Sequence, residues 1–282
     1  MSKVYFVGCG PGDPDLITIK AKKLVQKADV IVYSGSLIPP EILKYNKKGK
    51  KHDAAKLVRE EIFDLLLKNS KKGKKHDAAK LVREEIFDLL LKNSKKGKTV
   101  VRLHDGDPAV YGAIREQIDN LEKEGVESIV VPGVTSFLAS AAALGTQLTL
   151  PGITQTMIIT RAESRTKVPK REKISELAKH QATLIFYLSV HLLNKISKEA
   201  IEGGYKKSTP VAVVYKASRK DQKIILGTLT DIAKKVRDEK IRMTAIVIIG
   251  DVIKPKSYEY SKLYDKTFSH GFRKAKKTKK KE

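Results

Sequence analysis

The sequence predicts an α/β fold made of two domains, and two observations carry this prediction. Continuous apolar segments typical of buried strands alternate with amphipathic segments typical of helices, which indicates a largely parallel sheet covered by helices. The stretch PVAVVYKASRKDQKIILGTL at 210–229 instead indicates two strands joined by a short polar turn, which favours a second, mixed sheet. The length of 282 residues suits one large domain or two smaller ones.

The expected elements follow one another at short intervals along the chain. Strands are predicted at 4–8, 29–35, 99–103, 128–133, 156–160, 182–189, 210–217, 223–229 and 244–250. Outside the repeat described next, helices are predicted at 18–28, 109–124, 135–144, 172–180, 191–203 and 229–239. We therefore expect an N-terminal domain at 1–132, a C-terminal domain at 133–253, and an extension with a basic tail at 254–282.

A perfect repeat interrupts this alternation, because KKGKKHDAAKLVREEIFDLLLKNS fills residues 47–70 and again residues 71–94. Each copy predicts one amphipathic helix, with Asp53 as the N-cap of the first. A solenoid needs three or more units, so two copies inside an otherwise non-repetitive sequence indicate an insertion. We expect one copy to pack and the other to protrude with an exposed apolar face, which makes the His-Asp pairs at 52–53 and 76–77 rivals for one position.

Composition limits the possible partners and the cellular setting. The net charge of +25 favours polyanions such as nucleic acid, anionic lipid or a polycarboxylate substrate, and equally fits a solvated Lys-rich surface. No apolar run is long enough for a transmembrane helix, and the N-terminus lacks the layout of a signal peptide. The lone Cys9 allows no intrachain disulfide, so we expect a reducing cytoplasm.

Three glycine-containing turns follow predicted strands, at GCGPGDPDLIT (8–18), RLHDGDPAVYG (102–112) and VVPGVTSFLASAAALG (130–145). The first departs from the dinucleotide fingerprint, and its Asp13 would repel a pyrophosphate. In the second, Asp107 is expected to cap a helix. Turns at the carboxyl ends of strands are where α/β folds bind ligands, so together they predict a binding site.

The second turn carries the more specific chemistry. Its bare glycine, Gly106, lies between two carboxylates and lets a ligand approach the backbone, while the acids can bind hydroxyl groups or favour a cation. Cys9 is expected to fill a tight turn rather than act as a reactive thiol. His104 is expected to be a strand-end side chain with a local hydrogen bond.

VGCGPGDPDLIT, LHDGDPAVYG and VPGVTSF, in this order, closely resemble the tetrapyrrole (corrin/porphyrin) methylases. The resemblance spans nearly the whole chain except one repeat copy and the last few residues. It implies a two-domain α/β fold with S-adenosyl-L-methionine as cofactor in the cleft between the domains. YSGSLIPPEIL, LPGITQTMIITRAESRT and TPVAVVYKAS are similar to the branch that methylates C-11 of precorrin-4 or cobalt-precorrin-4 in cobalamin synthesis.

The resemblance also implies roles for individual residues. The cofactor pocket is expected to be lined by Pro11, Asp105, Gly106, Asp107, Val110, Thr135, Ser136, Leu188, Ala217, Thr244 and Ala245. The substrate is expected to lie near Asp13, Ser34, Gly35, Ser36 and Arg161. Leu188 stands where relatives often have Met, and Arg219 stands where this branch often has Trp. No general base and no protein-bound metal are assigned.

The expected partner is a small tetrapyrrole polycarboxylate, with neither nucleic acid nor membrane, and the family implies a homodimer. Three other functions stay open. One is methylation of another ring carbon of a tetrapyrrole. Another is methylation of ribosomal RNA, since some proteins of this fold modify it and this chain is basic. The third is an inactive polyanion-binding protein, if the repeat disrupts the cleft.

Overall fold

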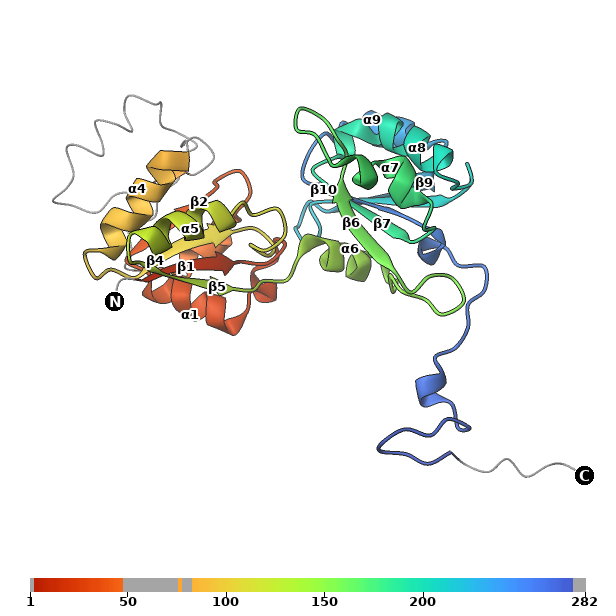
Figure 1. Cartoon of the computed structure of the whole chain (residues 1–282), viewed down its shortest axis with the longest axis horizontal. Coiled ribbons are helices and arrows are strands. Elements are labelled where there is room, and N and C mark those ends of the chain that lie inside the picture. Colours follow the sequence, from red (N-terminus) through yellow and green to blue (C-terminus); the bar gives the residue numbers. More distant parts are fainter. Residues whose placement is uncertain (1–2, 48–75, 78–82, 276–282) are drawn as a thin grey trace, which may run out of the picture. The chain divides into compact units, whose positions relative to one another are not determined.

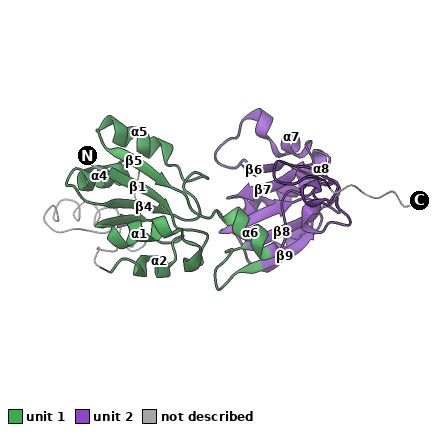
Figure 2. Ribbon diagram, turned by 90° about the horizontal axis from the view of Figure 1, so that it is seen from below, with its two compact units in different colours: residues 1–143, 215–223 green, residues 144–214, 224–282 purple. Residues whose placement is uncertain are grey.

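The chain forms two compact units, each with its own sheet. The computed structural model describes residues 3–47, 76–77 and 83–275. Unit 1 comprises residues 1–143 and 215–223, and unit 2 comprises residues 144–214 and 224–282 (Figure 2). Helix α6 (Ser136–Leu144) therefore groups with unit 1, whereas our predicted second domain begins at 133.

The sheet of unit 1 is parallel, as the sequence predicts. Its strand order is β3-β2-β4-β1-β5, and each neighbouring pair in this order runs in the same direction. The strands are β1 (Lys3–Gly8), β2 (Val30–Tyr33), β3 (His76–Asp77), β4 (Val100–His104) and β5 (Glu127–Val131). Because the strands are parallel, the turns that leave β1, β2, β4 and β5 all lie at one edge of the sheet.

Helices cover both faces of this sheet (Figure 1). One face packs against α1 (Ile19–Lys27) and α2 (Pro40–Lys44), with Ala21, Val25 and Ile42 in its core. The other face packs against α4 (Arg83–Ser94) and α5 (Arg115–Lys123). The near-continuous apolar strands follow from this arrangement, since each strand is covered on both sides.

Helix α4 belongs to the second copy of the repeat. Its apolar stripe, Ile86, Leu89 and Leu90, is buried in the same core as Phe6 and Val100 of the sheet. The structure thus identifies the copy that packs, which the sequence leaves open. Our prediction that the other copy protrudes concerns residues outside the described part of the chain.

One predicted boundary is wrong. We expect a helix from 109, but α5 begins only at Arg115. The apolar periodicity locates this helix correctly and says little about where it begins. Asp53, which we expect to be an N-cap, lies outside the described residues, and its counterpart Asp77 ends β3, which pairs with Val32 and Tyr33.

Unit 2 contains a mixed sheet, as expected from its hairpin-like sequence. The order is β6-β7-β10-β8-β9; β6 and β7 are parallel, and β10 runs antiparallel to β7. The strands are β6 (Met157–Arg161), β7 (Thr183–Tyr187), β8 (Pro210–Tyr215), β9 (Lys223–Thr228) and β10 (Ala245–Ile249). The main helices of the unit are α7 (Ile174–Ala178), α8 (Leu193–Glu202) and α9 (Ile232–Asp238).

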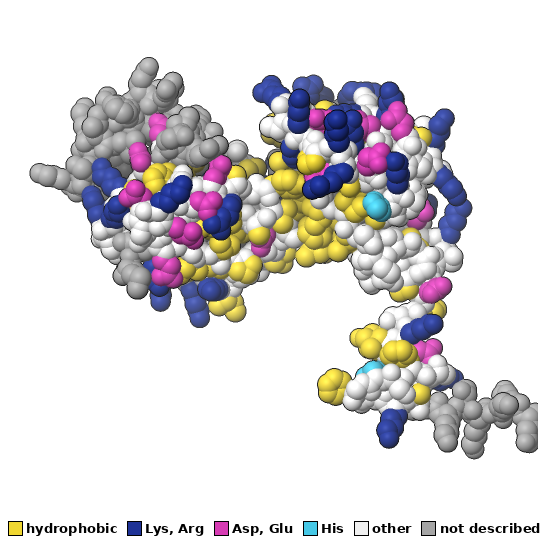
Figure 3. Space-filling model, in the orientation of Figure 1, with side chains coloured by type: hydrophobic (Ala, Val, Ile, Leu, Met, Phe, Trp, Pro, Cys, Tyr) yellow, Lys and Arg dark blue, Asp and Glu magenta, His cyan; other side chains and the backbone are white. Residues whose placement is uncertain are grey.

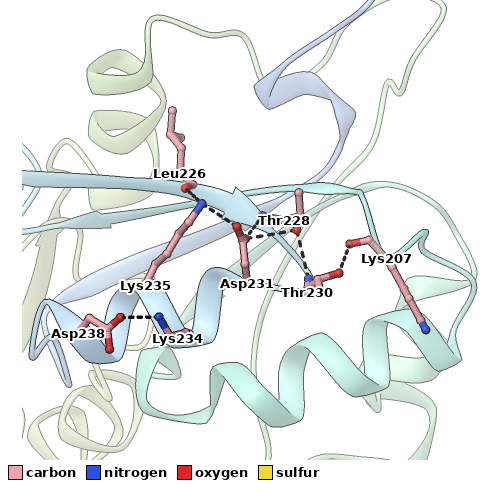
Figure 4. Close-up of polar contacts among 8 residues, drawn as sticks. All are labelled: Lys207, Leu226, Thr228, Thr230, Asp231, Lys234, Lys235 and Asp238. Atoms are coloured by element: carbon pink, nitrogen blue, oxygen red, sulfur yellow. Dashed lines mark hydrogen bonds and ion pairs between the residues drawn. The ribbon is translucent and has the colours of Figure 1, made fainter.

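Asp231 organises the corner between β9 and α9 (Figure 4). Its Oδ1 accepts hydrogen bonds from the backbone amide of Thr228 at 2.7 Å and from the Thr228 hydroxyl at 3.2 Å. Its Oδ2 lies 2.7 Å from Nζ of Lys235, which also donates to the carbonyl of Leu226 at 3.1 Å. The Lys235 contact lowers the pKa of Asp231 and keeps its charge in place to hold the turn.

The C-terminal extension begins against unit 2. The backbone amide of Glu259 donates to the carbonyl of Pro151 at 2.9 Å, and His270 pairs with Arg273 through two backbone hydrogen bonds. No helix in the described part of the chain combines the length and apolar character that a membrane crossing demands.

Candidate active site

Two of the three predicted turns are joined directly by their backbones. They leave β1 and β4, which are neighbours in the sheet of unit 1. The amide of Cys9 donates to the carbonyl of His104 at 2.9 Å, which extends the ladder past the strand ends. Gly10 and Gly106 then exchange a pair of hydrogen bonds, at 2.8 and 3.3 Å. The sheet therefore continues into the site and holds both turns rigidly.

The third turn, after β5, packs so closely that only glycine fits at the contact. A Cβ atom on Gly133 would lie 2.1 Å from the carbonyl oxygen of Gly106, and one on Gly8 would lie 2.7 Å from the same atom. Backbone cannot yield as a flexible side chain can, so Gly8 and Gly133 are needed for steric reasons. Gly106 itself has φ of +59°, a conformation that favours glycine.

Asp107 fastens the β4 turn to the β5 turn. Its Oδ1 accepts a hydrogen bond from the amide of Ala109 at 2.8 Å, which stabilises a local turn. Its Oδ2 accepts one from the amide of Gly133 at 2.9 Å. Asp107 therefore caps a turn and braces the site instead of capping a helix as we predict. Because both of its oxygens accept backbone hydrogen bonds, the Asp107 carboxylate holds these two turns in place.

Asp105 is the carboxylate that stays available for a ligand. Its side chain is exposed, and no ion pair connects it to the described residues. Desolvation by the surrounding protein nevertheless raises its pKa, and this outweighs the lowering effects of its backbone hydrogen bond and of Arg219 and Arg102. A carboxylate with a raised pKa gains from a hydroxyl donor or from a cation placed beside it.

Cys9 and His104, the thiol and the imidazole next to the strand ends, each keep one protonation state near neutral pH. Cys9 is 1% exposed, and burial raises its pKa to about 12, so the thiol stays protonated at neutral pH. His104 is 8% exposed, and desolvation, together with Arg102, lowers its pKa to about 3. Our prediction of a local hydrogen bond for His104 is not met at Nε2, which has no partner among the described residues.

His104 predicts a specific acid sensitivity. The unfolded chain binds a proton at this residue below about pH 6.5, whereas the folded chain resists it down to about pH 3. Stability therefore falls as pH drops through this window, by up to about 1.4 kcal/mol per pH unit for one group. Replacing His104→Asn should flatten the dependence of the unfolding free energy on pH between 6.5 and 3, measured by urea denaturation.

The exposed His180 provides the matched control for this experiment. His180→Asn should leave the pH dependence as it is in the unmodified chain. A His104→Asn variant whose stability follows the unmodified chain across the whole window would contradict the buried, neutral histidine.

Residues 215–223 bring two further side chains to this edge of unit 1. The Ser218 hydroxyl accepts a hydrogen bond from the amide of Asp13 at 3.0 Å. The Arg219 side chain crosses Gly12, where a Cβ would meet its Cγ at 2.3 Å, and its Nη2 donates to the carbonyl of Leu37. Its Nε is buried without an acceptor in the described part of the chain. We did not predict a role for Ser218, and only its place in a polar turn could have suggested one.

The other unit 1 residues expected in the site lie in these turns, in the turn after β2, or beside Ser218. Pro11 and Thr135 are buried, Asp13 and Val110 are half-buried, and Ala217 is buried beside Ser218. Ser136 is the first residue of α6. Ser34, Gly35 and Ser36 follow β2 and carry the chain toward α2, with the carbonyl of Ser34 accepting from the amides of Leu37 and Ile38.

The unit 2 residues expected in the site gather at one end of its own sheet. Arg161 ends β6 opposite Tyr187, the last residue of β7, and Leu188 comes directly after Tyr187. Ala245 begins the antiparallel β10, and Thr244 comes directly before it. Leu188 is 67% exposed, and both Leu188 and the β-branched Thr244 have positive φ, at 53° and 56°. Such strain persists only where the surroundings enforce it and often accompanies function.

The guanidinium of Arg161, which we expect near the substrate, already donates two hydrogen bonds to the backbone. Its Nη1 donates to the carbonyl of Thr166 at 3.0 Å, and its Nη2 donates to that of Lys167 at 2.8 Å. In this arrangement it closes the loop that follows β6. Among the described residues, no group of three or more His, Cys, Asp or Glu side chains is arranged to hold a metal ion.

Comparison with known proteins decides the family. The family model for Tetrapyrrole (Corrin/Porphyrin) Methylases matches residues 3–233. The chain belongs to the tetrapyrrole methylases. Among relatives in this family, a cobalt-precorrin-4 C(11)-methyltransferase of Methanocaldococcus jannaschii is 50% identical over 274 residues, covering 97% of this chain and 96% of the relative. A cobalt-precorrin-4 C(11)-methyltransferase of Priestia megaterium is 44% identical, with 96% and 98% covered.

Solved structures of tetrapyrrole methylases share the fold. The X-ray structure of a cobalt precorrin-4 methyltransferase, a cobalamin biosynthetic enzyme, superposes with a TM-score of 0.79 at 42% identity, covering 90% of this chain and 96% of that one. A uroporphyrin-III C-methyl transferase from Thermus thermophilus, complexed with S-adenyl homocysteine, gives a TM-score of 0.68 at 29% identity, with 89% and 93% covered. The parallel and mixed sheets predicted from sequence are thus the family's architecture.

Proposed function

We propose that this chain is an S-adenosyl-L-methionine-dependent methyltransferase that methylates C-11 of precorrin-4 or cobalt-precorrin-4 in cobalamin biosynthesis. One comparison carries the choice of acceptor. The chain is 50% identical to the cobalt-precorrin-4 C(11)-methyltransferase of Methanocaldococcus jannaschii and 36% identical to the uroporphyrinogen-III C-methyltransferase of the same organism. Both relatives match nearly full-length, so the difference in identity favours precorrin-4.

The residues at the edge of unit 1 fit the proposed cofactor. S-adenosylmethionine, when bound, supplies a methyl group on a positively charged sulfur. Asp105 offers an exposed carboxylate with a raised pKa, which can accept from ribose hydroxyls or lie beside that positive charge. The turn at Gly106, held by Gly10, leaves backbone accessible to a flat ligand. The full set of cofactor-lining residues implied by the family stays a prediction.

The chain's own part in the reaction is to align the methyl donor with its acceptor and to exclude water. The departing thioether is neutral, so no strong acid is needed, and positioning can supply much of the rate. Cys9 and His104 are unsuited to proton transfer near neutral pH, because one keeps its proton and the other does not take one. We assign no general base.

We further propose that Arg219 binds a carboxylate of the substrate. A buried guanidinium donor without an acceptor is costly, and the Nε of Arg219 is in that position. The side chain lies between the turn after β1 and the turn after β2, where Asp13 and Ser34 are expected to face the substrate. A tetrapyrrole polycarboxylate would provide the acceptor.

Replacing Arg219→Gln should raise KM for the tetrapyrrole about tenfold or more, because a charge-assisted hydrogen bond is lost, while KM for S-adenosylmethionine changes little. Steady-state kinetics with each substrate varied in turn measures this. Lys220→Gln, which removes the neighbouring exposed cation, is the control and should leave both constants unchanged. Equal KM values for Arg219→Gln and the unmodified chain would assign Arg219 to structure alone.

A binding experiment and a methyl-transfer assay separate the proposed function from its alternatives. S-adenosylhomocysteine should raise the melting temperature of the purified chain, since a ligand that binds only the folded state stabilises it. Methyl label from S-adenosylmethionine should then pass to cobalt-precorrin-4 and not to ribosomal RNA. Label in ribosomal RNA alone would overturn the proposed acceptor, and the absence of a thermal shift would overturn the cofactor.

The quaternary state and location stay predictions. We propose a homodimer, so light scattering should give about twice the 31.4 kDa of one chain, and a mass of one chain would contradict it. We propose a cytoplasmic location because the only cysteine, Cys9, is unpaired and the proposed substrate is a biosynthetic intermediate.

A further inference from the structure

Unit 2 contains a hollow that the proposed reaction does not use. It has a volume of about 350 Å³ and lies between the start of α8, with the short 3₁₀ helix before it (Val190–Leu192), and the end of α9. Its floor is apolar: Val190, Leu193, Val236 and Ile241 line it, and each is at most 6% exposed. A volume of this size is at the lower end of the range for small-molecule sites.

The end of α9 gives the hollow a cationic rim. The amide of Lys240 donates to the carbonyl of Arg237 at 2.9 Å, and the amide of Ile241 donates to that of Val236 at 3.3 Å. This termination, with Lys240 at φ of 57°, turns the chain back over the hollow, so that Arg237, Lys240 and Arg242 all line it. His191 lines it from the opposite side.

Arg237, Lys240 and Arg242 form no ion pair within the described part of the chain. Asp238 pairs with Lys234 at 3.5 Å, and Asp231 pairs with Lys235 at 2.7 Å (Figure 4). No acidic side chain lines the hollow. Over the part of unit 2 that carries α8 and α9, Lys and Arg side chains lie together with Asp and Glu side chains (Figure 3). Neighbouring cations repel one another, and a bound anion relieves that repulsion.

We propose that this hollow binds a small organic anion, with its apolar body against the floor and its carboxylate or phosphate group at the rim. The apolar floor leaves no polar group facing the apolar body of the ligand, and Arg237 and Arg242 supply forked donors suited to oxyanions. Asn194, also in the lining, adds a neutral amide for a polar edge of the ligand. None of the residues expected to bind the cofactor lines the hollow, so the proposal does not depend on the proposed function.

Three naphthalene probes test the proposal on the full chain. Isothermal titration should detect binding of 2-naphthoate and of 1-naphthyl phosphate, and the preferred one identifies the oxyanion. The neutral 2-naphthalenemethanol, with the same apolar body, should bind at least tenfold more weakly. Affinity for the anions should fall as salt concentration rises, because exposed charges are screened.

Matched variants locate the binding. The double variant Arg237→Gln/Arg242→Gln should weaken anion binding at least tenfold, while Lys198→Gln/Lys206→Gln, which removes two exposed cations of unit 2 away from the hollow, should not. Ala233→Phe should block the hollow without changing its charge. Equal binding of the neutral alcohol, unchanged binding in the arginine variant, or displacement of the probes by S-adenosylhomocysteine would each overturn the proposal.

Discussion

In a chain that keeps one copy of the repeat, Leu90→Ala should lower the free energy of unfolding by about 2–5 kcal/mol. Removing residues 47–70 and removing residues 71–94 yield the same polypeptide. A single deletion variant therefore leaves only one copy that can form this helix. Leu90 is fully buried against the sheet of unit 1, beside Ile86 and Leu89, and its truncation leaves a cavity. Urea denaturation measures the loss. A loss below 1 kcal/mol would contradict the packing of α4.

In the full chain the same Leu90→Ala change should cost only about 1 kcal/mol or less. The first copy offers an identical apolar stripe, Ile62, Leu65 and Leu66, so it can take the place of a damaged second copy. Exchanging the copies only swaps a long and a short connection on either side of the helix, which leaves the loop-closure entropy nearly unchanged.

The double variant Leu66→Ala/Leu90→Ala is the control for this exchange. It damages both copies and should restore the loss of about 2–5 kcal/mol seen in the single-copy chain. Leu66→Ala alone should leave stability nearly unchanged. If Leu90→Ala costs as much in the full chain as in the single-copy chain, the first copy cannot replace α4. The single-copy chain itself should keep its methyltransferase activity.

Gly133→Ala should destabilise unit 1 by about 3 kcal/mol or more and abolish binding of S-adenosylhomocysteine. The added Cβ would lie 2.1 Å from the carbonyl oxygen of Gly106 and 2.9 Å from backbone atoms of Gly8. Relieving these contacts separates the β4 and β5 turns and breaks the hydrogen bond from the Gly133 amide to Asp107. Thermal denaturation with and without S-adenosylhomocysteine measures both effects.

Gly125→Ala provides the comparison for this variant. Gly125 follows α5 at φ of +71°, and a Cβ there would meet no atom within 4 Å. Alanine should therefore cost only the about 1–2 kcal/mol of a left-handed conformation and leave ligand binding intact. If Gly133→Ala behaves like Gly125→Ala, the close approach of the three turns is not essential to the site.

Apolar periodicity was enough to predict the strands and most helices, because burial on both faces leaves an uninterrupted signal. The meeting of the turns after β1, β4 and β5 also follows from sequence, since parallel strands bring such turns to one edge. Apolar periodicity could not predict that α5 begins at Arg115. There the Asp107 turn and two residues with positive φ, Tyr111 and Ala113, delay the helix.

The sequence also could not predict that residues 215–223 contact the turns after β1 and β2. Ser218 and Arg219 act through contacts with Asp13 and Leu37, about two hundred residues away in the chain. Local sequence preferences do not encode such a contact. The sequence of a polar turn is the same whether the turn packs against another part of the chain or faces solvent. The choice between repeat copies was undecidable for a simpler reason, because their sequences are identical.

The most direct test of the proposed function is the mass of the product. The purified chain, incubated with S-adenosylmethionine carrying a labelled methyl group and with cobalt-precorrin-4, should yield a tetrapyrrole heavier by one labelled methyl group, attached at C-11. Mass spectrometry measures the addition, and nuclear magnetic resonance identifies the carbon. An unchanged tetrapyrrole, or a methyl group on another carbon, from a chain that binds S-adenosylhomocysteine would contradict the proposal.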